Sequence, residues 1–152
     1  MESNRQCPFC SERIMKYVFD ESEQFKAVYN RAPILPGHSM IIPKKHIESV
    51  FDFTGEEFSE FFSFARKVTQ SLLKAFETDA FNWSLQEKEA GGQTVGHLHL
   101  HIIVRKQHDL GKPGDWYAML QQSQNQHIDS LERAAVDDET LLATLSMIKN
   151  YQ

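Results

Sequence analysis

The sequence predicts an α+β protein: an antiparallel sheet of about five strands, with one long helix packed on it and a C-terminal helix. Two observations favour this class. Short segments rich in β-branched and aromatic residues alternate with turn-forming residues, and most links between them are too short for the crossovers that parallel strands require. One longer segment instead repeats its apolar residues with helical spacing.

The first elements are short. Residues 11–16 have room for one helical turn. Residues 17–19 and 25–29 read as the two strands of a hairpin. Residues 39–42 are expected to form a third strand, which Pro43 ends because proline has no N–H to donate to a sheet.

The long helix is predicted to begin at Thr54. Thr54 and Glu57 have the spacing of a capping box, in which each side chain accepts a hydrogen bond from the other residue's backbone N–H. The apolar residues that follow are expected to form one buried stripe: Phe58, Phe61, Phe62, Ala65, Val68, Leu72, Leu73 and Phe76. Such a stripe is typical of a helix on a sheet rather than of a cofactor site.

Further strands and loops follow this helix. Residues 81–86 are predicted to form a fourth strand and residues 94–105 a fifth, with a turn at residues 89–92 between them. Residues 106–115 contain two glycines and a proline and are expected to be a loop. Residues 116–126 are expected to be helical.

The chain is expected to end in a helix and to form a single domain. Asp137 and Asp138 suit the N-terminus of a helix because acidic groups interact favourably with its dipole. We place the domain core at about residues 7–117 and a C-terminal extension at residues 118–152. The apolar residues of the last helix are Leu141, Leu142, Leu145 and Ile148.

Composition argues against several classes of protein. The 152 residues are 41% hydrophobic and 24% charged, as in ordinary globular proteins. A net charge of −5 argues against a broad surface for nucleic acid. No signal-peptide pattern is visible, and no apolar run approaches the ~20 residues that span a bilayer. We therefore expect a cytoplasmic protein with no membrane partner and no long nucleic-acid partner.

Three of the seven histidines alternate with apolar residues between Gly92 and Arg105. These are His97, His99 and His101. In a strand, alternate residues share one face at a spacing of about 6–7 Å, so the three imidazoles would stand in a row. Neither packing nor solubility calls for three histidines in register. The pattern favours a site, whether metal, nucleophile or proton relay.

The two cysteines, Cys7 and Cys10, form a Cys-Pro-Phe-Cys motif. Such a pair is either a redox dithiol or half of a metal site. A redox motif follows a strand, and too few residues precede Cys7 for one. We favour a metal, with His97 and His46 as the other ligands of a zinc site. The alternative is that the thiols are buried apolar groups and His46 is a surface residue.

The histidine row also fits covalent catalysis. Imidazole attacks phosphorus readily and leaves again readily. Donors for phosphate oxygens are available in Gln93, Thr94 and the backbone N–H groups near Gly92 and Gly37. The chain has neither a Walker pattern nor a dinucleotide-binding glycine motif, so this is not a standard nucleotide loop.

The run His97-Leu98-His99-Leu100-His101-Ile102-Ile103 resembles the signature of the histidine-triad (HIT) superfamily. Upstream, VYNRAPILPGHSMIIPKKHIESV resembles the HIT segment that carries a ribose-side asparagine or aspartate, a Pro-Gly-His turn and a Pro-Lys-x-His loop. The resemblance covers about residues 7–117 and implies the HIT-like fold. Within the superfamily the sequence is most similar to the fragile-histidine-triad branch of dinucleoside polyphosphate hydrolases.

This resemblance implies a role for each matching residue. His99 would be the nucleophile that forms a nucleotidyl-imidazole intermediate. His97 and His101 would orient it and bind phosphate, with His38 as a more distant fourth histidine. The substrate contacts would be Asn30 at the ribose, Val28 and Met40 at the base, Gln93 and Thr94 at the phosphates, Gln86 at the bridging oxygen, and Trp116 and Tyr117 over the leaving group.

The resemblance also implies a structural zinc ion and no organic cofactor. Many bacterial HIT proteins and the galactose-phosphate uridylyltransferases carry zinc at the positions that are Cys7, Cys10, His46 and His97 here. Eukaryotic fragile-histidine-triad proteins lack this set, so the chain combines features of two branches. HIT proteins commonly pair, which implies a homodimer.

The implied activity is that of a nucleotidyl hydrolase, which releases a nucleoside monophosphate from dinucleoside polyphosphates or related conjugates through a covalent nucleotidyl-histidine intermediate. Three alternatives stay open: a nucleoside phosphoramidase, a nucleotidyltransferase, and a nucleotide-binding sensor with incidental hydrolysis. The uridylyltransferases carry glutamine where this chain has His101, which ranks the transferase last. The phosphoramidases usually carry serine where this chain has Thr94.

Overall fold

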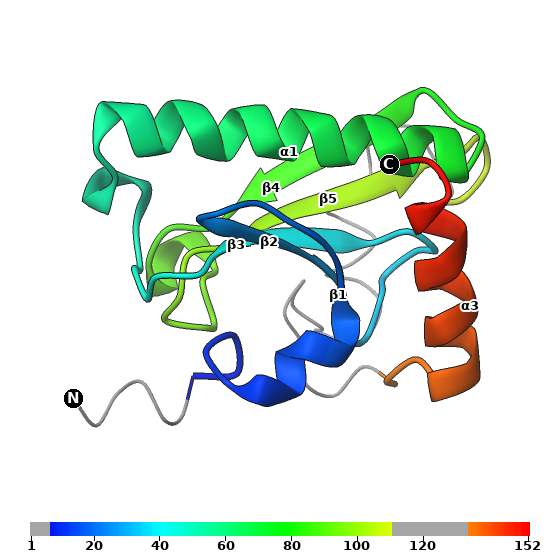
Figure 1. Ribbon diagram of the computed structural model, residues 1–152, viewed down its shortest axis with the longest axis horizontal. Helices are drawn as coiled ribbons and strands as arrows, with labels where there is room; N and C mark the ends of the chain where they lie inside the picture. Colours follow the sequence, from blue (N-terminus) through cyan, green and yellow to red (C-terminus); the bar gives the residue numbers. More distant parts are fainter. Residues whose placement is uncertain (1–6, 111–133) are drawn as a thin grey trace.

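The centre of the computed structural model, which describes residues 7–110 and 134–152, is a five-stranded antiparallel sheet. Its spatial order is β1-β2-β3-β5-β4 (Figure 1). The strands are β1 (Val18–Glu21), β2 (Phe25–Tyr29), β3 (Ser39–Pro43), β4 (Ala80–Leu85) and β5 (Leu100–Arg105). The helices are η2 (Glu12–Tyr17), η3 (Val50–Asp52), α1 (Gly55–Ala75), η4 (Glu89–Gly91) and α3 (Asp138–Lys149). The predicted fold class is confirmed.

Helix α1 begins as the sequence predicts and covers one face of the sheet (Figure 1). Thr54 is its N-cap, and both hydrogen bonds of the capping box with Glu57 form. The predicted buried stripe is partly wrong. Phe64 is buried because it lies one turn from Phe61 and Val68, whereas Phe58 is 46% exposed on the flank of the helix.

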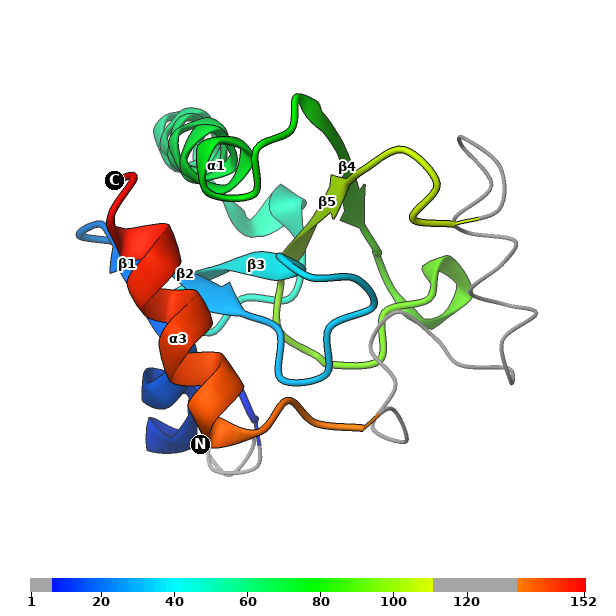
Figure 2. The ribbon, with the colours of Figure 1, turned by 90° about the vertical axis from the view of Figure 1, so that its right-hand side faces the viewer.

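Helix α3 lies beside β1 and the end of α1 (Figure 2). Asp137 caps it by accepting a hydrogen bond from the Thr140 backbone N–H, in agreement with the predicted start. Leu141, Leu145 and Ile148 are buried, whereas Leu142 is 65% exposed. The C-terminal helix therefore closes the apolar core at the β1 edge of the sheet.

The predicted fifth strand is wrong in its first half. Strand β5 begins at Leu100, so His97 and His99 precede it and only His101 lies within it. The segment leaves the sheet because it turns toward another loop: the Leu98 backbone N–H donates to the carbonyl of Ile47 at 2.7 Å. The three histidines consequently do not stand in one row on a strand.

Strand register places several candidate residues on the sheet face opposite α1. Val28 pairs with Met40, Met40 pairs with His101, and His101 pairs with Ser84. Directly opposed residues point to the same face, so these four side chains form one row across four strands. The alternate residues of β5, such as Ile102, belong to the core under α1. We call the face that carries this row the histidine face.

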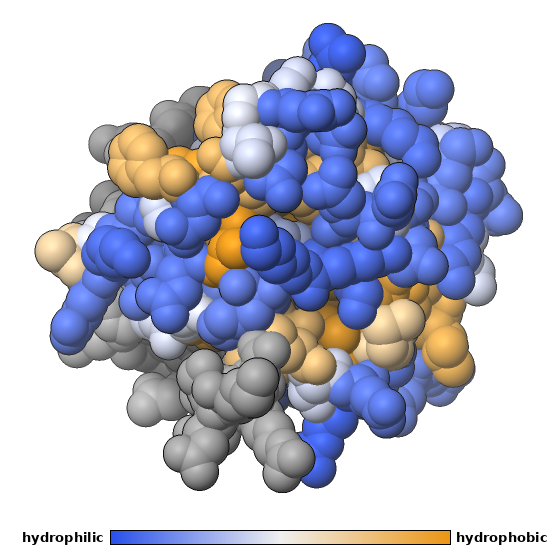
Figure 3. All heavy atoms as spheres, turned by 60° about the vertical axis from the view of Figure 1, so that its left-hand side comes forward, coloured by the Kyte–Doolittle hydropathy of each residue, from blue (hydrophilic) through white to orange (hydrophobic). Residues whose placement is uncertain are grey.

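The face of the molecule in Figure 3 is predominantly polar. Figure 3 shows one face on which hydrophilic side chains prevail and hydrophobic ones form separate small areas. Among the described residues, no helix combines the length and apolar character needed to cross a membrane.

Candidate functional site

Four metal-ligating side chains meet beside the histidine face. Cys7 and Cys10 precede η2, His46 follows β3, and His97 precedes β5. Their potential ligand atoms all lie within 4.8 Å of one another. The structure thus brings together the four residues predicted as a metal site, although Cys7 and His97 are 90 positions apart in the chain.

The spacing of these atoms fits a tetrahedral metal ion. Bonds of about 2.3 Å to sulfur and about 2.0 Å to nitrogen at tetrahedral angles place the two ligand atoms about 3.5 Å apart. The Sγ atom of Cys7 lies 3.4 Å from His97 Nδ1, and the Sγ atom of Cys10 lies 3.3 Å from His46 Nδ1. Two thiols and two imidazoles are ligands that zinc prefers. The residues present therefore fit zinc.

The hydrogen bonds of His97 prepare its ring for a metal. The Nε2–H group donates to the carbonyl of Pro43 at 2.9 Å, which leaves the lone pair on Nδ1, facing both thiols. Burial lowers the pKa of His97 from 6.5 to about 4, and positive charge on His46 acts in the same direction. At neutral pH the ring is therefore uncharged, as a metal ligand must be.

The pKa of the Cys10 thiol shifts upward instead. Burial raises the pKa of Cys10 from 9.0 to about 11, and the hydrogen bond and charge of Cys7 act in the same direction. A bound divalent cation would reverse this shift, because the thiolate is the form that ligates a metal. Metal binding is therefore expected to release protons and to weaken as the pH falls.

The ring of His99 is buried and held from several sides. Its Nδ1–H donates to the carbonyl of His97 at 2.7 Å, so the lone pair of the uncharged ring lies on Nε2. The ring centroid of Phe9 lies 5.0 Å away and that of His101 lies 4.9 Å away, both edge-on. His97 therefore serves both sites: its ring faces the thiols, and its backbone carbonyl orients His99.

A chain of hydrogen bonds fixes the tautomers of the other two histidines. The backbone N–H of Ile34 donates to His38 Nδ1 at 3.1 Å. His38 must then carry its proton on Nε2, which donates to His101 Nδ1 at 2.9 Å. The proton of uncharged His101 consequently lies on Nε2. A backbone N–H is always a donor. The Ile34 N–H therefore determines which ring nitrogen carries the proton in His38 and, through His38, in His101.

The Pro-Gly-His turn positions His38. Gly37 has a φ of 94°, and a Cβ atom there would lie 3.0 Å from Val104 Cγ2. Only glycine adopts this positive φ without strain and also leaves room for the Val104 side chain. The Gly37 backbone N–H donates to the hydroxyl of Tyr29 at 3.1 Å, which ties the turn to β2. The turn therefore holds His38 under the sheet, within reach of His101.

The residues predicted to contact the nucleoside lie on the same face. Val28 and Met40 are buried neighbours in the row that contains His101. Asn30 is also buried; its Oδ1 accepts a hydrogen bond from the Ala32 N–H at 2.9 Å, and its Nδ2 lies 3.7 Å from Met40 Sδ. Their roles in binding stay predictions, and the predicted Trp116 and Tyr117 lie outside the described residues.

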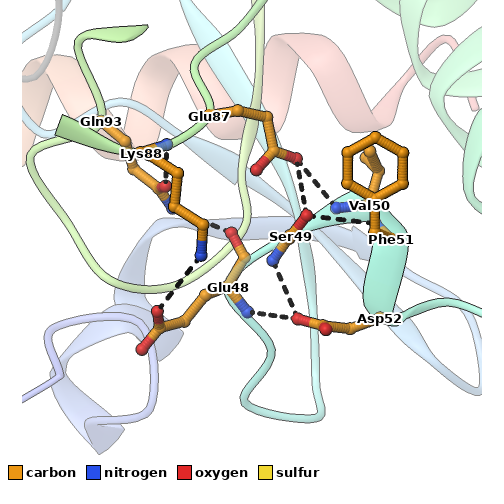
Figure 4. Close-up of polar contacts among 8 residues, drawn as sticks. All are labelled: Glu48, Ser49, Val50, Phe51, Asp52, Glu87, Lys88 and Gln93. Atoms are coloured by element: carbon orange, nitrogen blue, oxygen red, sulfur yellow. Dashed lines mark hydrogen bonds and ion pairs between the residues drawn. The ribbon is translucent and has the colours of Figure 1, made fainter. Parts of the chain in front are cut away.

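Gln93 has a different set of partners from those that the sequence predicts. Its Oε1 accepts a hydrogen bond from the Lys88 N–H at 2.8 Å, and its Nε2 donates to the carbonyl of Glu48 at 3.0 Å (Figure 4). Thr94 beside it is exposed. The Gln93 side chain thus joins two loops, and its backbone N–H donates to the carbonyl of Lys88 at 3.0 Å. The roles of Gln93 and Thr94 at the phosphates stay predictions.

Glu87 reinforces the same junction. Its Oε1 accepts hydrogen bonds from the Val50 N–H at 2.9 Å and from the Ser49 hydroxyl at 3.3 Å (Figure 4). Lys88 adds an ion pair with Glu48 at 3.9 Å. These contacts hold the loop that follows the metal candidate His46 against the loop that leads into the histidine segment.

Taken together, the histidine face offers an imidazole whose Nε2 carries the lone pair, in His99, and a second imidazole whose proton position is fixed, in His101. An imidazole whose Nε2 carries the lone pair can attack an electrophilic phosphorus, as nucleophilic catalysis requires. A neighbouring Nε2–H is a hydrogen-bond donor for the oxygens of the same phosphate. The four candidate metal ligands are connected to this pair through the backbone of His97, whose carbonyl accepts the hydrogen bond from His99.

Sequence reasoning missed three contributors. Phe9, whose ring contacts His97 and His99, lies inside the Cys-Pro-Phe-Cys motif, and that position was its signal. Ser84 lies beside Gln86 and shares its face, which strand alternation could have indicated. No pattern in the sequence pointed to Glu87, because its partners Ser49 and Val50 lie in a distant loop.

An antiparallel sheet with alternating histidines at the start of an interior strand defines the class of histidine-triad proteins. The HIT domain family model matches residues 11–108. The chain therefore belongs to the HIT family.

Individual relatives agree with this assignment. The chain is 33% identical over 138 residues to the asymmetrical bis(5'-nucleosyl)-tetraphosphatase of Schizosaccharomyces pombe, a match that covers 88% of this chain and 76% of that protein. It is 36% identical over 93 residues to the bis(5'-adenosyl)-triphosphatase of Dictyostelium discoideum, covering 61% of this chain and 62% of that protein.

A solved structure shares the fold. The zinc-bound histidine triad family protein of Mycobacterium smegmatis superposes with a TM-score of 0.67 at 21% identity, over 98% of this chain and 99% of that one. At this identity the likeness shows the fold alone.

Proposed function

We propose that the protein hydrolyses dinucleoside polyphosphates or related nucleotide conjugates and releases a nucleoside monophosphate. The observation that carries this proposal is the orientation of His99, whose Nδ1–H is committed to the carbonyl of His97 at 2.7 Å. The relatives that act on bis(5'-nucleosyl) tetraphosphates and bis(5'-adenosyl) triphosphates support the substrate class.

The proposed reaction has two displacements at the α-phosphorus. The Nε2 lone pair of His99 bonds to phosphorus, and the bond from phosphorus to the bridging oxygen breaks, so the leaving nucleotide takes the electron pair. Water then attacks the same phosphorus, the P–N bond breaks, and Nε2 recovers its lone pair. One proton of the water passes to solvent. The Nε2–H of His101 would donate to the phosphate oxygens as their charge grows.

Turnover by His99 variants tests this proposal. Purified protein is assayed with diadenosine tetraphosphate, diadenosine triphosphate, an adenosine phosphoramidate and a nucleotide sugar, and the products are separated by chromatography. We expect His99→Asn to lose at least about a thousandfold in kcat while it still binds nucleotide. Wild-type activity in His99→Asn would overturn the mechanism. Tight binding of intact dinucleotide with negligible turnover by wild type would favour the sensor.

We further propose that Cys7, Cys10, His46 and His97 hold a structural zinc ion. The fit of their ligand atoms to tetrahedral spacing supports this assignment. When bound, zinc would supply cross-linking of the N-terminal arm to the histidine segment, without contact with substrate. Elemental analysis of protein purified without chelator should give about one equivalent per chain. A Cys7→Ala/Cys10→Ala variant with unchanged zinc content would refute the site.

A homodimer is also part of the proposal. Strand β4 is the last strand of the described sheet, and aromatic side chains extend from it onto α1. They are Phe81, Trp83, Phe62 and Phe58, with successive ring centroids 5.7, 5.9 and 4.9 Å apart. An apolar surface beside an open strand edge suits pairing with a second copy. Trp83→Glu is expected to shift the protein to a monomer in analytical ultracentrifugation. The cytoplasmic location stays a prediction.

A further inference from the structure

Gln86 occupies a buried position with an unusual hydrogen-bond pattern. The residue is only 5% exposed. One end of its carboxamide, assigned as Nε2, lies 2.6 Å from the hydroxyl oxygen of Ser84. The other end, assigned as Oε1, is fully buried and has no hydrogen-bond partner among the described residues. A buried polar atom of this kind indicates a missing partner, because leaving one unpaired is costly.

The distance to Ser84 indicates which end of the carboxamide faces the hydroxyl. The two ends of a carboxamide have the same shape, so their hydrogen bonds decide the assignment. N–H···O bonds are generally about 2.7–3.2 Å long, whereas O–H···O bonds extend down to about 2.5 Å. At 2.6 Å, the contact suits a Ser84 hydroxyl that donates to the Gln86 oxygen. The buried end that lacks a partner is then the NH2 group, which is a donor.

The register of the sheet places this donor near His99. Leu85 pairs with Leu100 at the end of the β4–β5 ladder. Gln86 follows Leu85 and reaches the histidine face through its contact with Ser84. His99 precedes Leu100, and its ring centroid lies 4.9 Å from that of His101. Ser84, two residues before Gln86, pairs with His101 on the same face. A donor at this position suits an oxygen of a phosphate attached to His99, which can only accept a hydrogen bond.

We propose that Ser84 is a positioning residue that turns the Gln86 carboxamide so that its NH2 group faces the substrate phosphates. The inference rests on the proposed function, because it assigns the donor to the substrate of that site. The Ser84 hydroxyl donates to Oε1, and the short separation of 2.6 Å favours this orientation over the opposite one, in which an oxygen would face the negatively charged phosphates. Ser84 itself does not touch the substrate.

A double-mutant cycle tests this role. Ser84→Ala, Gln86→Ala and the double variant are compared by kcat and KM with diadenosine tetraphosphate. We expect Ser84→Ala to lower kcat about three- to tenfold, as the loss of one hydrogen bond predicts, with little change in KM. In the Gln86→Ala background the same substitution should cost nothing further, since Ser84 acts through Gln86. Ser84→Thr retains the hydroxyl and should restore the rate.

Ser71→Ala is the matched control. Ser71 lies on α1, and its hydroxyl donates to the Lys67 carbonyl at 3.4 Å, so it has no route to the histidine face. A second variant, Gln86→Glu, places an oxygen at both ends of the side chain. It should be less active than Gln86→Ala because a carboxylate would face the phosphates. This comparison does not depend on the folding of any Ser84 variant.

The side-chain amide of Gln86 gives a readout that is independent of turnover. Its Nε2 signals in 15N-labelled protein should shift on addition of adenosine monophosphate in wild type and should not shift in Ser84→Ala. Any one of three results would overturn the inference. In the double variant, the losses in kcat from the two substitutions would add. In Ser84→Ala, the amide signals of Gln86 would still shift with nucleotide, or Gln86→Glu would have wild-type activity. Loss of activity in Ser84→Ala together with full activity in His99→Asn would instead contradict the proposed function.

Discussion

Acidification of the metal-free protein is expected to weaken its fold through His97. Burial holds the pKa of this ring at about 4 in the folded protein, against 6.5 for an unperturbed histidine. Between these values the unfolded chain binds a proton that the folded protein does not bind, so stability falls as the pH falls. His97 alone is expected to remove about 2 kcal/mol between pH 7.5 and pH 5.

Urea unfolding of chelator-treated protein at a series of pH values measures this effect. The comparison is with His97→Gln, which retains a donor for the Pro43 carbonyl but has no proton to gain. The difference in free energy of unfolding between wild type and His97→Gln should shrink by about 2 kcal/mol as the pH falls from 7.5 to 5. His108→Asn is the control, because His108 is exposed and asparagine tolerates its positive φ of 65°.

A constant difference between wild type and His97→Gln across this range would refute the reasoning. It would mean that the His97 ring accepts a proton in the folded protein as readily as in the unfolded chain. An NMR titration of the ring should give the same answer directly, with a midpoint near pH 4 rather than 6.5.

Three further predictions follow from the contacts. Phe61→Ala should lower the free energy of unfolding by about 3–5 kcal/mol in urea unfolding, because this ring is fully buried against Phe25 and Phe53; a loss below 1 kcal/mol would show that α1 is loosely packed. Gln93→Ala should lower the free energy of unfolding by about 1–2 kcal/mol in the same assay, since two loop hydrogen bonds are lost. An unchanged free energy of unfolding would show that the Gln93 side chain does not hold the two loops together. His38→Ala should lower kcat at least about tenfold with diadenosine tetraphosphate, because His101 loses the donor that fixes its tautomer; an unchanged kcat would contradict that role.

Local patterns were sufficient to predict most of the fold. The capping box of Thr54, the hairpin of β1 and β2, and the proline that ends β3 depend on residues close together in the chain, and all three formed. The buried stripe of α1 was less accurate. Phe58 and Phe64 have equal hydrophobicity, and only the position of the sheet decides that one is exposed and the other buried.

The sequence predicts the four residues of the candidate metal site, which the structure brings together, but it does not predict the geometry of the histidine segment. The alternation of His97, His99 and His101 suggested a row on one strand, but the strand begins after His99. The cause is a long-range contact, the bond from Leu98 to the carbonyl of Ile47, which no local pattern reveals. The same holds for the bond between His97 and Pro43, which decides which ring nitrogen faces the thiols.

Trapping of the covalent intermediate tests the central claim most directly. Wild-type protein is mixed with radiolabelled diadenosine tetraphosphate and quenched within milliseconds at alkaline pH, where a phosphorus–nitrogen bond to histidine survives. We predict labelled adenylate on the peptide that contains His99, lost on acid treatment and absent from His99→Asn. Full turnover with no labelled protein at any quench time, or label on the peptide of His99→Asn, would contradict the account.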